Sequence, residues 1–430
     1  MTKQILIVGG GYVGMYTALR LHRMLRRDEA RVTVVDPRGY MTYQPFLAEA
    51  AGGTIEPRHV VAPLPRVLKG ARVLTGKITA IDHKRRRATF QPAQGPAETL
   101  DYDVLVMAAG SITRTLPIDG LARYGVGFKT VNEAVHLRNH VLTQLAAAAS
   151  TDDPQVRRRA LGFVVVGGGF AGVEALAELQ GLADDAVRYH PALSRDDLRW
   201  TLVEATGRIL PELAESLGEW TAKTLTRRGV DVRLHTRLAG AAEGEVRLDD
   251  GTVLDAGTLI WAAGGRPNPL AAATGLPVDA IGRIKVSAAL QVEGEPDVFA
   301  AGDGAAVPDL TRPGEFCAPN AQHAVRQTKT LARNIVAYLR GRELKPYKHA
   351  YLGSVAGLGH HQGVAQVYRI KLTGFLGWLA HRVYHLAWVP TFGHKARVLA
   401  DWTLALAFHR EVTQLAGLEA PAADFRDAAA

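Results

Sequence analysis

Two glycine-rich segments of this chain share the spacing G-x-G-x-x-G; their glycines are Gly9, Gly11 and Gly14, then Gly167, Gly169 and Gly172. In such a segment the first glycine permits a tight turn, the second lets the backbone approach a pyrophosphate, and the third lets a helix pack closely on a strand. The N-terminus of the following helix attracts the negative charge. One such segment is weak evidence, because similar turns form for packing alone. Two together predict two dinucleotide sites.

An acidic residue follows each glycine set at the end of the next predicted strand. Asp36 ends the run RVTVVD, 22 residues after the first set, where an acid hydrogen-bonds an adenosine ribose. Glu204 ends the run RWTLVE, 32 residues after the second set, and we attribute this longer gap to an insertion at 181–198. An acid here repels a 2′-phosphate, which favours NADH over NADPH, although Arg208 lies nearby.

The elements that position these residues are two short apolar runs. They read QILIVGGGYVG at 4–14 and GFVVVGGGFAG at 162–172, about 158 residues apart. Continuous apolar runs of this length are typical of parallel strands buried on both faces. Each run is followed by a helical pattern, so the sequence predicts two βαβ dinucleotide folds.

Two further predicted strands, at 102–111 and 258–268, end in small residues: Ala109 and Gly110 in the first, Gly264 in the second. Small residues suit strand ends where the backbone passes close to a cofactor. A third strand, within 293–305, ends in Gly302 and Asp303. Asp303 can accept a hydrogen bond from a flavin ribityl hydroxyl, and it can equally serve as a helix N-cap.

Composition excludes several classes of protein. Of the 430 residues, 47% are hydrophobic and 22% are charged, as in ordinary globular chains. Cys317 is the only cysteine, which excludes a cysteine zinc site and internal dithiol chemistry and favours a small buried hydrophobe. The histidines lack metal-ligand spacing, so we expect no metal site. The net charge of +9 favours anionic partners, but no nucleic-acid-binding motif accompanies it.

The order of these segments resembles the flavoproteins with two dinucleotide-binding domains. The resemblance implies an α/β fold of two Rossmann-like domains, the second inserted in the first, with FAD on the first and NADH on the second. We expect an FAD-binding domain at 1–115 and 285–345, an NADH-binding domain at 116–284, and a C-terminal membrane-docking and acceptor-side region at 346–430.

Within that superfamily the chain resembles the type II NADH dehydrogenases, the single-subunit NADH:quinone oxidoreductases. The similar segments are MTYQPFLAEAAGGTIEP (41–57), GGGFAGVEALAEL (167–179) and APNAQHAVRQTKTLARNI (318–335). The resemblance implies that Gln44 lines the flavin, that Glu174 reaches toward the nicotinamide–flavin contact and that Gln322 contacts the quinone.

The chain departs from the family pattern on the quinone side. The family's second glutamine, four residues after the first, is replaced here by Arg326, and Gln327 follows it. A permanently charged guanidinium seeks an anionic or carbonyl partner, which leaves the acceptor open. Alternatively, Arg326 turns outward and Gln327 packs against the flavin.

The C-terminal region predicts two amphipathic helices. One apolar face is formed by Phe375, Leu376, Leu379, Val383 and Leu386, and a second by Val398, Leu399, Trp402 and Leu406. Trp, Tyr, Lys and Arg beside such faces suit a helix lying in the plane of a membrane surface. The polar residues His381, Arg382 and His385 argue against a membrane-crossing helix. Packing on the protein body or on a second copy is the alternative.

The resemblance implies hydride transfer from NADH to FAD and then two electrons to a membrane quinone, either menaquinone or ubiquinone. It places the protein peripherally on the cytoplasmic face of the inner (plasma) membrane and leaves a homodimer open. Two alternatives use the same folds. One is a soluble reductase of a ferredoxin- or rubredoxin-like protein; the other is a redox-sensing flavoprotein resembling apoptosis-inducing factor.

Overall fold

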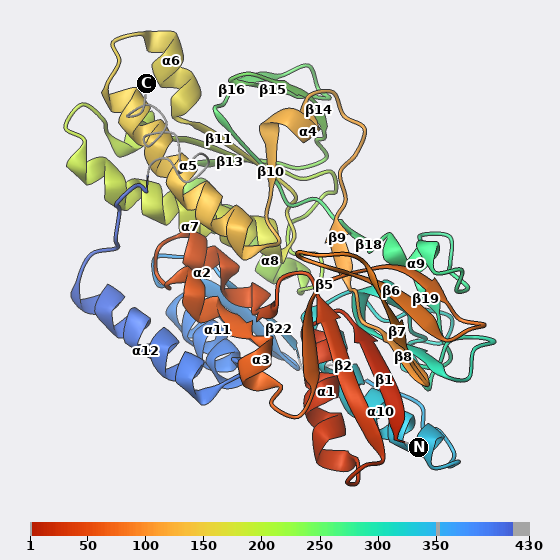
Figure 1. The fold of residues 1–430 in the computed structure, drawn as a ribbon. Coiled ribbons are helices and arrows are strands. Elements are labelled where there is room, and N and C mark those ends of the chain that lie inside the picture. The colour runs from red at the N-terminus through yellow and green to blue at the C-terminus, as the bar shows by residue number, and fades with distance from the viewer. Residues whose placement is uncertain (1, 350–352, 416–430) are drawn as a thin grey trace, which may run out of the picture. The chain divides into compact units, whose positions relative to one another are not determined.

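The computed structural model describes residues 2–349 and 353–415 of an α/β protein (Figure 1). The chain forms two compact units, each assembled from separate segments. The first comprises Met1–Thr42, Val61–Ile112 and Gly265–Tyr351, and the second comprises Tyr43–Val60, Thr113–Gly264 and Leu352–Ala430.

The first unit is built on a seven-stranded sheet with the order β20-β8-β1-β2-β5-β6-β7. Its strands are β1 (Lys3–Val8), β2 (Ala30–Asp36), β5 (Arg72–Asp82), β6 (Arg87–Pro92), β7 (Glu98–Asp101), β8 (Val104–Met107) and β20 (Val298–Ala300). Strands β20 to β5 are parallel, whereas β6 and β7 pair antiparallel. The predicted apolar run is fully buried at Ile7, as expected for a strand with helices or chain on both faces.

Helices α1 (Tyr12–Met24) and α10 (Ala321–Leu339) pack against each other in the first unit. Its smaller elements are β3 (Tyr40–Thr42), β4 (Val61–Pro63), α3 (Leu64–Val67), β9 (Ser111–Thr113), β18 (Gly265–Pro267), α9 (Leu270–Ala273), β19 (Ile284–Lys285), β21 (Ala305–Ala306) and the 3₁₀ turn η5 (Gly302–Gly304). Asn320 caps α10 by accepting a hydrogen bond from the backbone N–H of His323, which determines where this helix begins.

The second unit contains a five-stranded parallel sheet with the order β10-β17-β11-β12-β13. Its strands are β10 (Gly125–Gly127), β11 (Gly162–Val166), β12 (Arg199–Val203), β13 (Val230–Arg233) and β17 (Thr258–Trp261). Its helices before the C-terminal region are α2 (Leu47–Ala51), α4 (Leu121–Tyr124), α5 (Val131–Ala149), α6 (Pro154–Ala160), α7 (Phe170–Ala186) and α8 (Glu215–Arg227). Figure 1 shows α5 and α7 side by side, and the short α2 contacts both.

Two antiparallel sheets of three strands complete the second unit. One is formed by β14 (Leu238–Ala242), β15 (Glu245–Leu248) and β16 (Val253–Asp255); the other by β22 (Gly353–Gly357), β23 (Gly363–Val367) and β24 (Ile370–Thr373). Helix α11 (Gly374–Trp388) packs on β22 and β23 and contacts α12 (Phe392–Ala407). No helix of the described ranges 2–349 and 353–415 is long and apolar enough to cross a membrane.

Helix α7 is longer than the sequence pattern indicated. The predicted insertion at 181–198 begins inside this helix, which continues to Ala186 and buries Leu182 and Ala183. Two 3₁₀ turns, η3 (Val187–Tyr189) and η4 (Arg195–Asp197), occupy half of the rest. The true insertion is therefore only the segment between α7 and β12.

The C-terminal helices form as predicted, and α11 exposes the predicted apolar face. Its residues Phe375, Leu376 and Val383 are more than half exposed, while His381 and Arg382 are buried. Two polar side chains of α11 therefore face the protein beside the buried Trp378, while several apolar ones face outward, which differs from the usual arrangement of a surface helix.

The apolar face predicted for α12 is partly buried and partly exposed. Val398 and Trp402 are buried, whereas Leu399 and Leu406 are exposed, so the protein covers only one side of this face. The exposed apolar residues of α12 are Phe392, Leu399, Leu404 and Leu406. The compact units also differ from the three predicted domain ranges: the second unit takes in the early segment 43–60 and the C-terminal region, of which 416–430 lies outside the described residues.

Candidate functional site

The predicted flavin-site residues of the first unit gather at one edge of its sheet. Strands β20, β8, β1 and β2 are neighbours and parallel, so their carboxyl ends lie together. Gly9 follows β1, and Asp36 is the last residue of β2. Ala109 and Gly110 follow β8, and Gly302 and Asp303 follow β20. In open α/β sheets this edge is where ligands bind.

The three glycines of the first set meet different surroundings. Gly9 has a φ of +106°, and a Cβ on it would lie 2.4 Å from the carbonyl oxygen of Ala108. A Cβ on Gly14 would lie 1.8 Å from the carbonyl oxygen of Gly9, whereas one on Gly11 would meet nothing within 4 Å. Packing therefore requires the outer two glycines, and the middle one borders open space. This cradle fits a pyrophosphate close to the backbone.

The acids of this edge are held by short hydrogen bonds. Asp36 accepts from the backbone N–H of Gly10 at 2.8 Å through Oδ2 and from that of Arg38 at 2.9 Å through Oδ1. Asp303 accepts from the Ser111 hydroxyl at 2.6 Å. Asp303 lies inside η5, whose N-cap position is Ala301, so its alternative role as a helix cap is wrong. Ser111 was not singled out from the sequence, because a lone serine after a strand carries no distinctive signal.

The second glycine set repeats this geometry in the second unit. Gly167 has a φ of +116°, a Cβ on Gly172 would lie 1.9 Å from the carbonyl oxygen of Gly167, and one on Gly169 would meet nothing within 4 Å. Gly167, Glu204 and Gly264 follow the carboxyl ends of the neighbouring strands β11, β12 and β17. A second cradle of the same shape is therefore present.

Glu204 is fixed beside this second cradle. Its Oε2 accepts from the backbone N–H of Gly168 at 2.6 Å, and its Oε1 accepts from the backbone and hydroxyl of Thr206 at 2.8 Å each. The guanidinium of Arg208 donates to backbone carbonyls of the loop that follows, including that of Pro211 at 3.2 Å. No hydrogen bond or ion pair between Arg208 and Glu204 is present in the described part of the chain.

Helix α10 carries the predicted quinone-side residues. Gln327 is 1% exposed, and its Oε1 accepts from the backbone N–H of Gly302 at 2.7 Å. Gln322 lies in the first turn of α10, and Arg326 lies one turn further. Gln327, not Arg326, therefore reaches the turn that follows β20.

The Arg326 guanidinium is half-buried and 3.3 Å from Nδ1 of His349, which also contacts the Tyr347 hydroxyl at 3.2 Å. Burial, together with His323 and Arg326, lowers the pKa of His349 to about 4. The imidazole is thus neutral near pH 7 and can accept the hydrogen bond. One of the two alternatives drawn from the sequence required Arg326 to turn outward. In the structure its side chain is half-buried and contacts His349.

Glu174 and Gln44 both belong to the second unit. Glu174, on α7, accepts from the backbone N–H of Gly357 at 2.8 Å, and its side chain is 13% exposed. Gln44 lies in the 3₁₀ turn η1 (Gln44–Phe46), is exposed and donates to the carbonyl of Lys129 at 3.3 Å. The structure thus groups Gln44 with the unit that contains Glu174, not with the flavin-site residues of the first unit.

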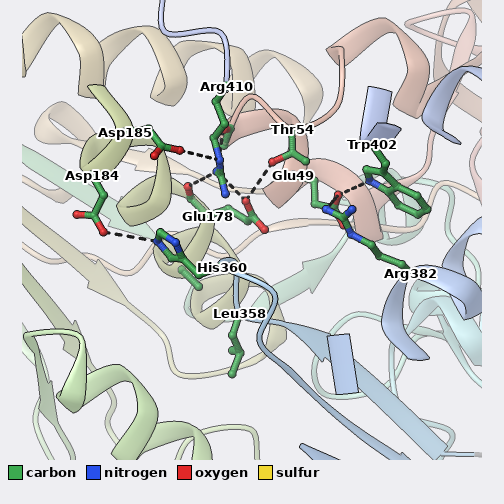
Figure 2. A network of polar contacts seen from close by, with 12 residues as sticks. Glu49, Thr54, Glu178, Asp184, Asp185, Leu358, His360, Arg382, Trp402 and Arg410 are labelled. Carbon is green, nitrogen blue, oxygen red and sulfur yellow. Dashed lines mark hydrogen bonds and ion pairs between the residues drawn. The ribbon is translucent and has the colours of Figure 1, made fainter. Parts of the chain in front are cut away.

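A buried polar network in the second unit was not predicted (Figure 2). Glu49 of α2 contacts Arg382 of α11 at 3.2 Å and accepts from the indole N–H of Trp402 at 2.6 Å. The Arg382 guanidinium lies between two indole rings, 4.3 Å from Trp378 and 4.5 Å from Trp402. Such stacking and pairing compensate for burying the charges. The only sequence signal is one acid inside the apolar run FLAEAA.

Polar contacts also connect the segment after α12 to helix α7. Arg410 contacts Glu178 at 3.0 Å and Asp185 at 3.3 Å, both on α7, and donates to the backbone carbonyl of Gly52 at 3.0 Å (Figure 2). The C-terminal segment is thus joined by buried charges to the helix that carries Glu174.

Cys317 is a buried thiol, as predicted. It is 6% exposed, and burial together with the nearby Asp309 raises its pKa to about 11. A thiol with this pKa stays protonated near neutral pH and is a poor nucleophile. With no second cysteine in the chain, it cannot form an intramolecular disulfide.

Comparison with known proteins identifies the family. The family model of pyridine nucleotide-disulphide oxidoreductases matches residues 3–328. The type II NADH:quinone oxidoreductase Ndh of Mycobacterium tuberculosis is 29% identical over 418 residues, covering 93% of this chain and 87% of the relative. The demethylphylloquinone reductase NdbB of Synechocystis is 30% identical over 406 residues, with 93% and 95% covered.

Two further matches agree. A type II NADH:quinone oxidoreductase of Staphylococcus haemolyticus is 30% identical over 378 residues, covering 86% of this chain and 91% of the relative. The solved structure of NDH2 from Plasmodium falciparum in complex with NADH has a TM-score of 0.88 at 19% identity, with 96% of this chain and 100% of that chain covered, which shows a shared fold. The chain belongs to the pyridine nucleotide-disulphide oxidoreductase family and, within it, to the type II NADH:quinone oxidoreductases.

Proposed function

We propose that this protein is an FAD-dependent NADH:quinone oxidoreductase. The observation that carries the proposal is the pair of glycine cradles, each beside an acid at the carboxyl edge of a parallel sheet, in a chain with one buried thiol. Its relatives from Mycobacterium tuberculosis and Staphylococcus haemolyticus carry this activity in their names. The lone cysteine excludes the disulphide chemistry that the wider family name mentions.

The first unit would hold FAD. Gly9, Gly11 and Gly14 form the pyrophosphate cradle, Asp36 faces the ribose, and Asp303 with Gly302 supports the ribityl chain. Ala109 and Gly110 supply a small-residue edge, since a Cβ on Gly110 would meet nothing within 4 Å. A bound FAD supplies the two-electron chemistry, accepting hydride from NADH and giving electrons to quinone. The protein's part is to hold the reactants in place.

The second unit would hold NADH. Gly167, Gly169 and Gly172 would form the cradle for its pyrophosphate. Glu204 would accept hydrogen bonds from the ribose hydroxyls, and Gly264 leaves room for the coenzyme after β17. The fixed Glu204 carboxylate would repel a 2′-phosphate, which favours NADH over NADPH. Glu174 would orient the nicotinamide, and Gln44 is assigned beside the flavin through the family resemblance.

On the acceptor side, we assign Gln322 as the donor to a quinone carbonyl. Arg326 replaces the family's second glutamine, and its contact with neutral His349 leaves a charged guanidinium on the same helix. A quinone carbonyl or a semi-reduced, anionic acceptor suits such a group. Gln327 would support the flavin indirectly through its bond to the backbone of Gly302.

We further propose that the outward apolar faces of α11 and α12 rest on a membrane surface, where menaquinone or ubiquinone is dissolved. Phe375, Leu376, Leu379 and Val383 are all at least 42% exposed, and Phe392 is 85% exposed. Exposed apolar faces of this kind are typical of interaction surfaces. The protein would then be peripheral, on the cytoplasmic face of the inner (plasma) membrane.

Steady-state oxidation of NADH by the FAD-loaded protein tests this function. Fast turnover with a short-chain ubiquinone or menaquinone analogue, and little with ferredoxin or rubredoxin, is expected. Fast turnover only with the iron–sulfur or iron proteins would favour a soluble reductase. Slow turnover with every acceptor would favour a redox sensor and overturn the proposal.

A further inference from the structure

His381 of α11 lies between two carboxylates that come from other elements. Its Nε2 is 3.2 Å from Oε1 of Glu174 on α7, and its Nδ1 is 3.9 Å from Oε1 of Glu49 on α2. The imidazole is 3% exposed. All three residues belong to the second unit. A buried ring in this position can act on Glu174 directly, without solvent in between.

The ring is not an ordinary core histidine. Within the described residues, neither ring nitrogen makes a hydrogen bond of good geometry, although both are buried. Buried polar groups without a partner are rare, and their persistence indicates a role other than packing. Both nitrogens instead face acidic oxygens, an arrangement in which the imidazolium is the stabilised form.

The charged and titratable groups around His381 come from four elements. They are Glu174 and Glu178 on α7, Glu49 on α2, Arg382 and His385 on α11, and Arg410 after α12. Burial by itself lowers the pKa of His381 and Arg382 lowers it further, but the Glu174 and Glu49 carboxylates outweigh both and raise it. Burial lowers the pKa of His385 well below its usual value, so this neighbour is neutral.

The contacts of Glu174 are one-sided. The backbone N–H of Gly357 and the ring of His381 both meet Oε1. No hydrogen bond or ion pair in the described ranges uses Oε2, so this oxygen remains available to a ligand. A carboxylate held at one oxygen by a backbone amide and a cation is preorganised at the other.

We propose that His381 is a positioning residue for Glu174: its ring, which lies between the Glu174 and Glu49 carboxylates, holds the Glu174 carboxylate oriented for the nicotinamide. This inference rests on the proposed role of Glu174 at the NADH site. Loss of the imidazolium proton at high pH would release Glu174 from this restraint.

The test is anaerobic stopped-flow reduction of the FAD-loaded protein by NADH, which isolates the first half-reaction. We expect Glu174→Gln and His381→Gln each to lower the limiting rate of flavin bleaching by about tenfold or more. In the double variant, His381→Gln should add no further loss, because it acts through Glu174. His190→Gln, on the same unit and outside this cluster, serves as the matched control and should bleach at the wild-type rate.

The pH profile separates positioning from a purely structural effect. The wild-type bleaching rate should fall as pH rises and the imidazolium loses its proton, and this alkaline limb should be absent in His381→Gln. Glu49→Gln removes the second carboxylate, so the limb should move to lower pH and remain visible. The Glu49 variant keeps the test available if His381→Gln fails to fold.

Three results would overturn the inference. They are unchanged bleaching in His381→Gln, multiplicative losses in the double variant, and an alkaline limb that persists without His381. An unchanged bleaching rate in Glu174→Gln would contradict the proposed role of Glu174 at the NADH site, on which the inference rests. The proposed function fails separately, in the second half-reaction, if quinone does not reoxidise the reduced flavin.

Discussion

Glu204 accepts a hydrogen bond from the backbone N–H of Gly168 at 2.6 Å, inside its own glycine loop. Asp36 does the same with Gly10 at 2.8 Å in the first unit. In both units the acid and the loop are therefore joined before any ribose is present. This restraint lowers the ordering cost of binding, because the carboxylate does not have to find its position.

The restraint on Glu204 predicts coenzyme preference. Replacing it in Glu204→Ala removes both the ribose acceptor and the repulsion of a 2′-phosphate. We expect kcat/KM for NADH to fall and the preference for NADH over NADPH to shrink by about tenfold or more. Steady-state kinetics with both coenzymes measure this. Glu219→Ala, exposed on α8, should keep the wild-type ratio. An unchanged ratio in Glu204→Ala would contradict the assignment.

The neighbours Gln327 and Arg326 should differ in what they affect. Gln327→Leu removes the acceptor of the N–H of the half-buried Gly302 and leaves this N–H without its partner, so FAD should bind at least about fivefold more weakly. Arg326→Gln should leave FAD affinity unchanged and alter KM for quinone. Flavin retention on dilution and quinone titrations check the two effects. FAD loss in Arg326→Gln with none in Gln327→Leu would reverse our assignment.

The outward face of α11 predicts membrane affinity. Substituting Leu376→Ser and Val383→Ser together removes two exposed apolar side chains, so co-sedimentation with anionic liposomes should weaken by about tenfold or more. Val253→Ser on β16 removes an apolar side chain that is 56% exposed elsewhere in the second unit, and should have no effect. Equal binding by all variants would exclude α11 as the docking face.

The pair Glu29–Arg340 predicts acid sensitivity of the first unit. Two hydrogen bonds of 2.7 Å from Arg340 lower the pKa of Glu29 from 4.5 to about 2. The unfolded chain therefore binds more protons between these values, so the contribution is complete above pH 4.5 and is lost as pH falls toward 2. In Glu29→Gln the urea midpoint should be lower at pH 7 and approach the wild-type midpoint near pH 2. Glu98→Gln, exposed on β7, is the control; a deficit independent of pH would contradict the linkage.

The sequence predicts what is set by local spacing. The glycine sets, Asp36 and Glu204 were found because a turn, a strand end and an acid recur at short, regular distances. The amphipathic pattern of α11 was equally visible, but periodicity does not say which face is inside. Here the buried partners of His381 and Arg382 are Glu174 and Glu49, more than 200 residues earlier in the chain, and no local pattern pairs them.

Single-residue differences in helix phase were also beyond the sequence. Arg326 and Gln327 are adjacent on α10, and only the packed helix shows that Gln327 turns toward Gly302 while Arg326 meets His349. Ser111 could not be recognised, because its role depends on Asp303, which comes from a distant strand. The face predicted for α12 is only partly exposed, because Trp402 turns inward to Glu49 while Leu399 and Leu406 remain exposed.

The most direct test of the central claim is sequential stopped-flow on the purified FAD-loaded protein in detergent. The flavin is first reduced anaerobically with NADH and then mixed with a menaquinone or ubiquinone analogue. We predict fast bleaching by NADH, slow bleaching by NADPH, and fast reoxidation by the quinone. Fast bleaching without quinone-driven reoxidation would contradict the assignment of this protein as an NADH:quinone oxidoreductase.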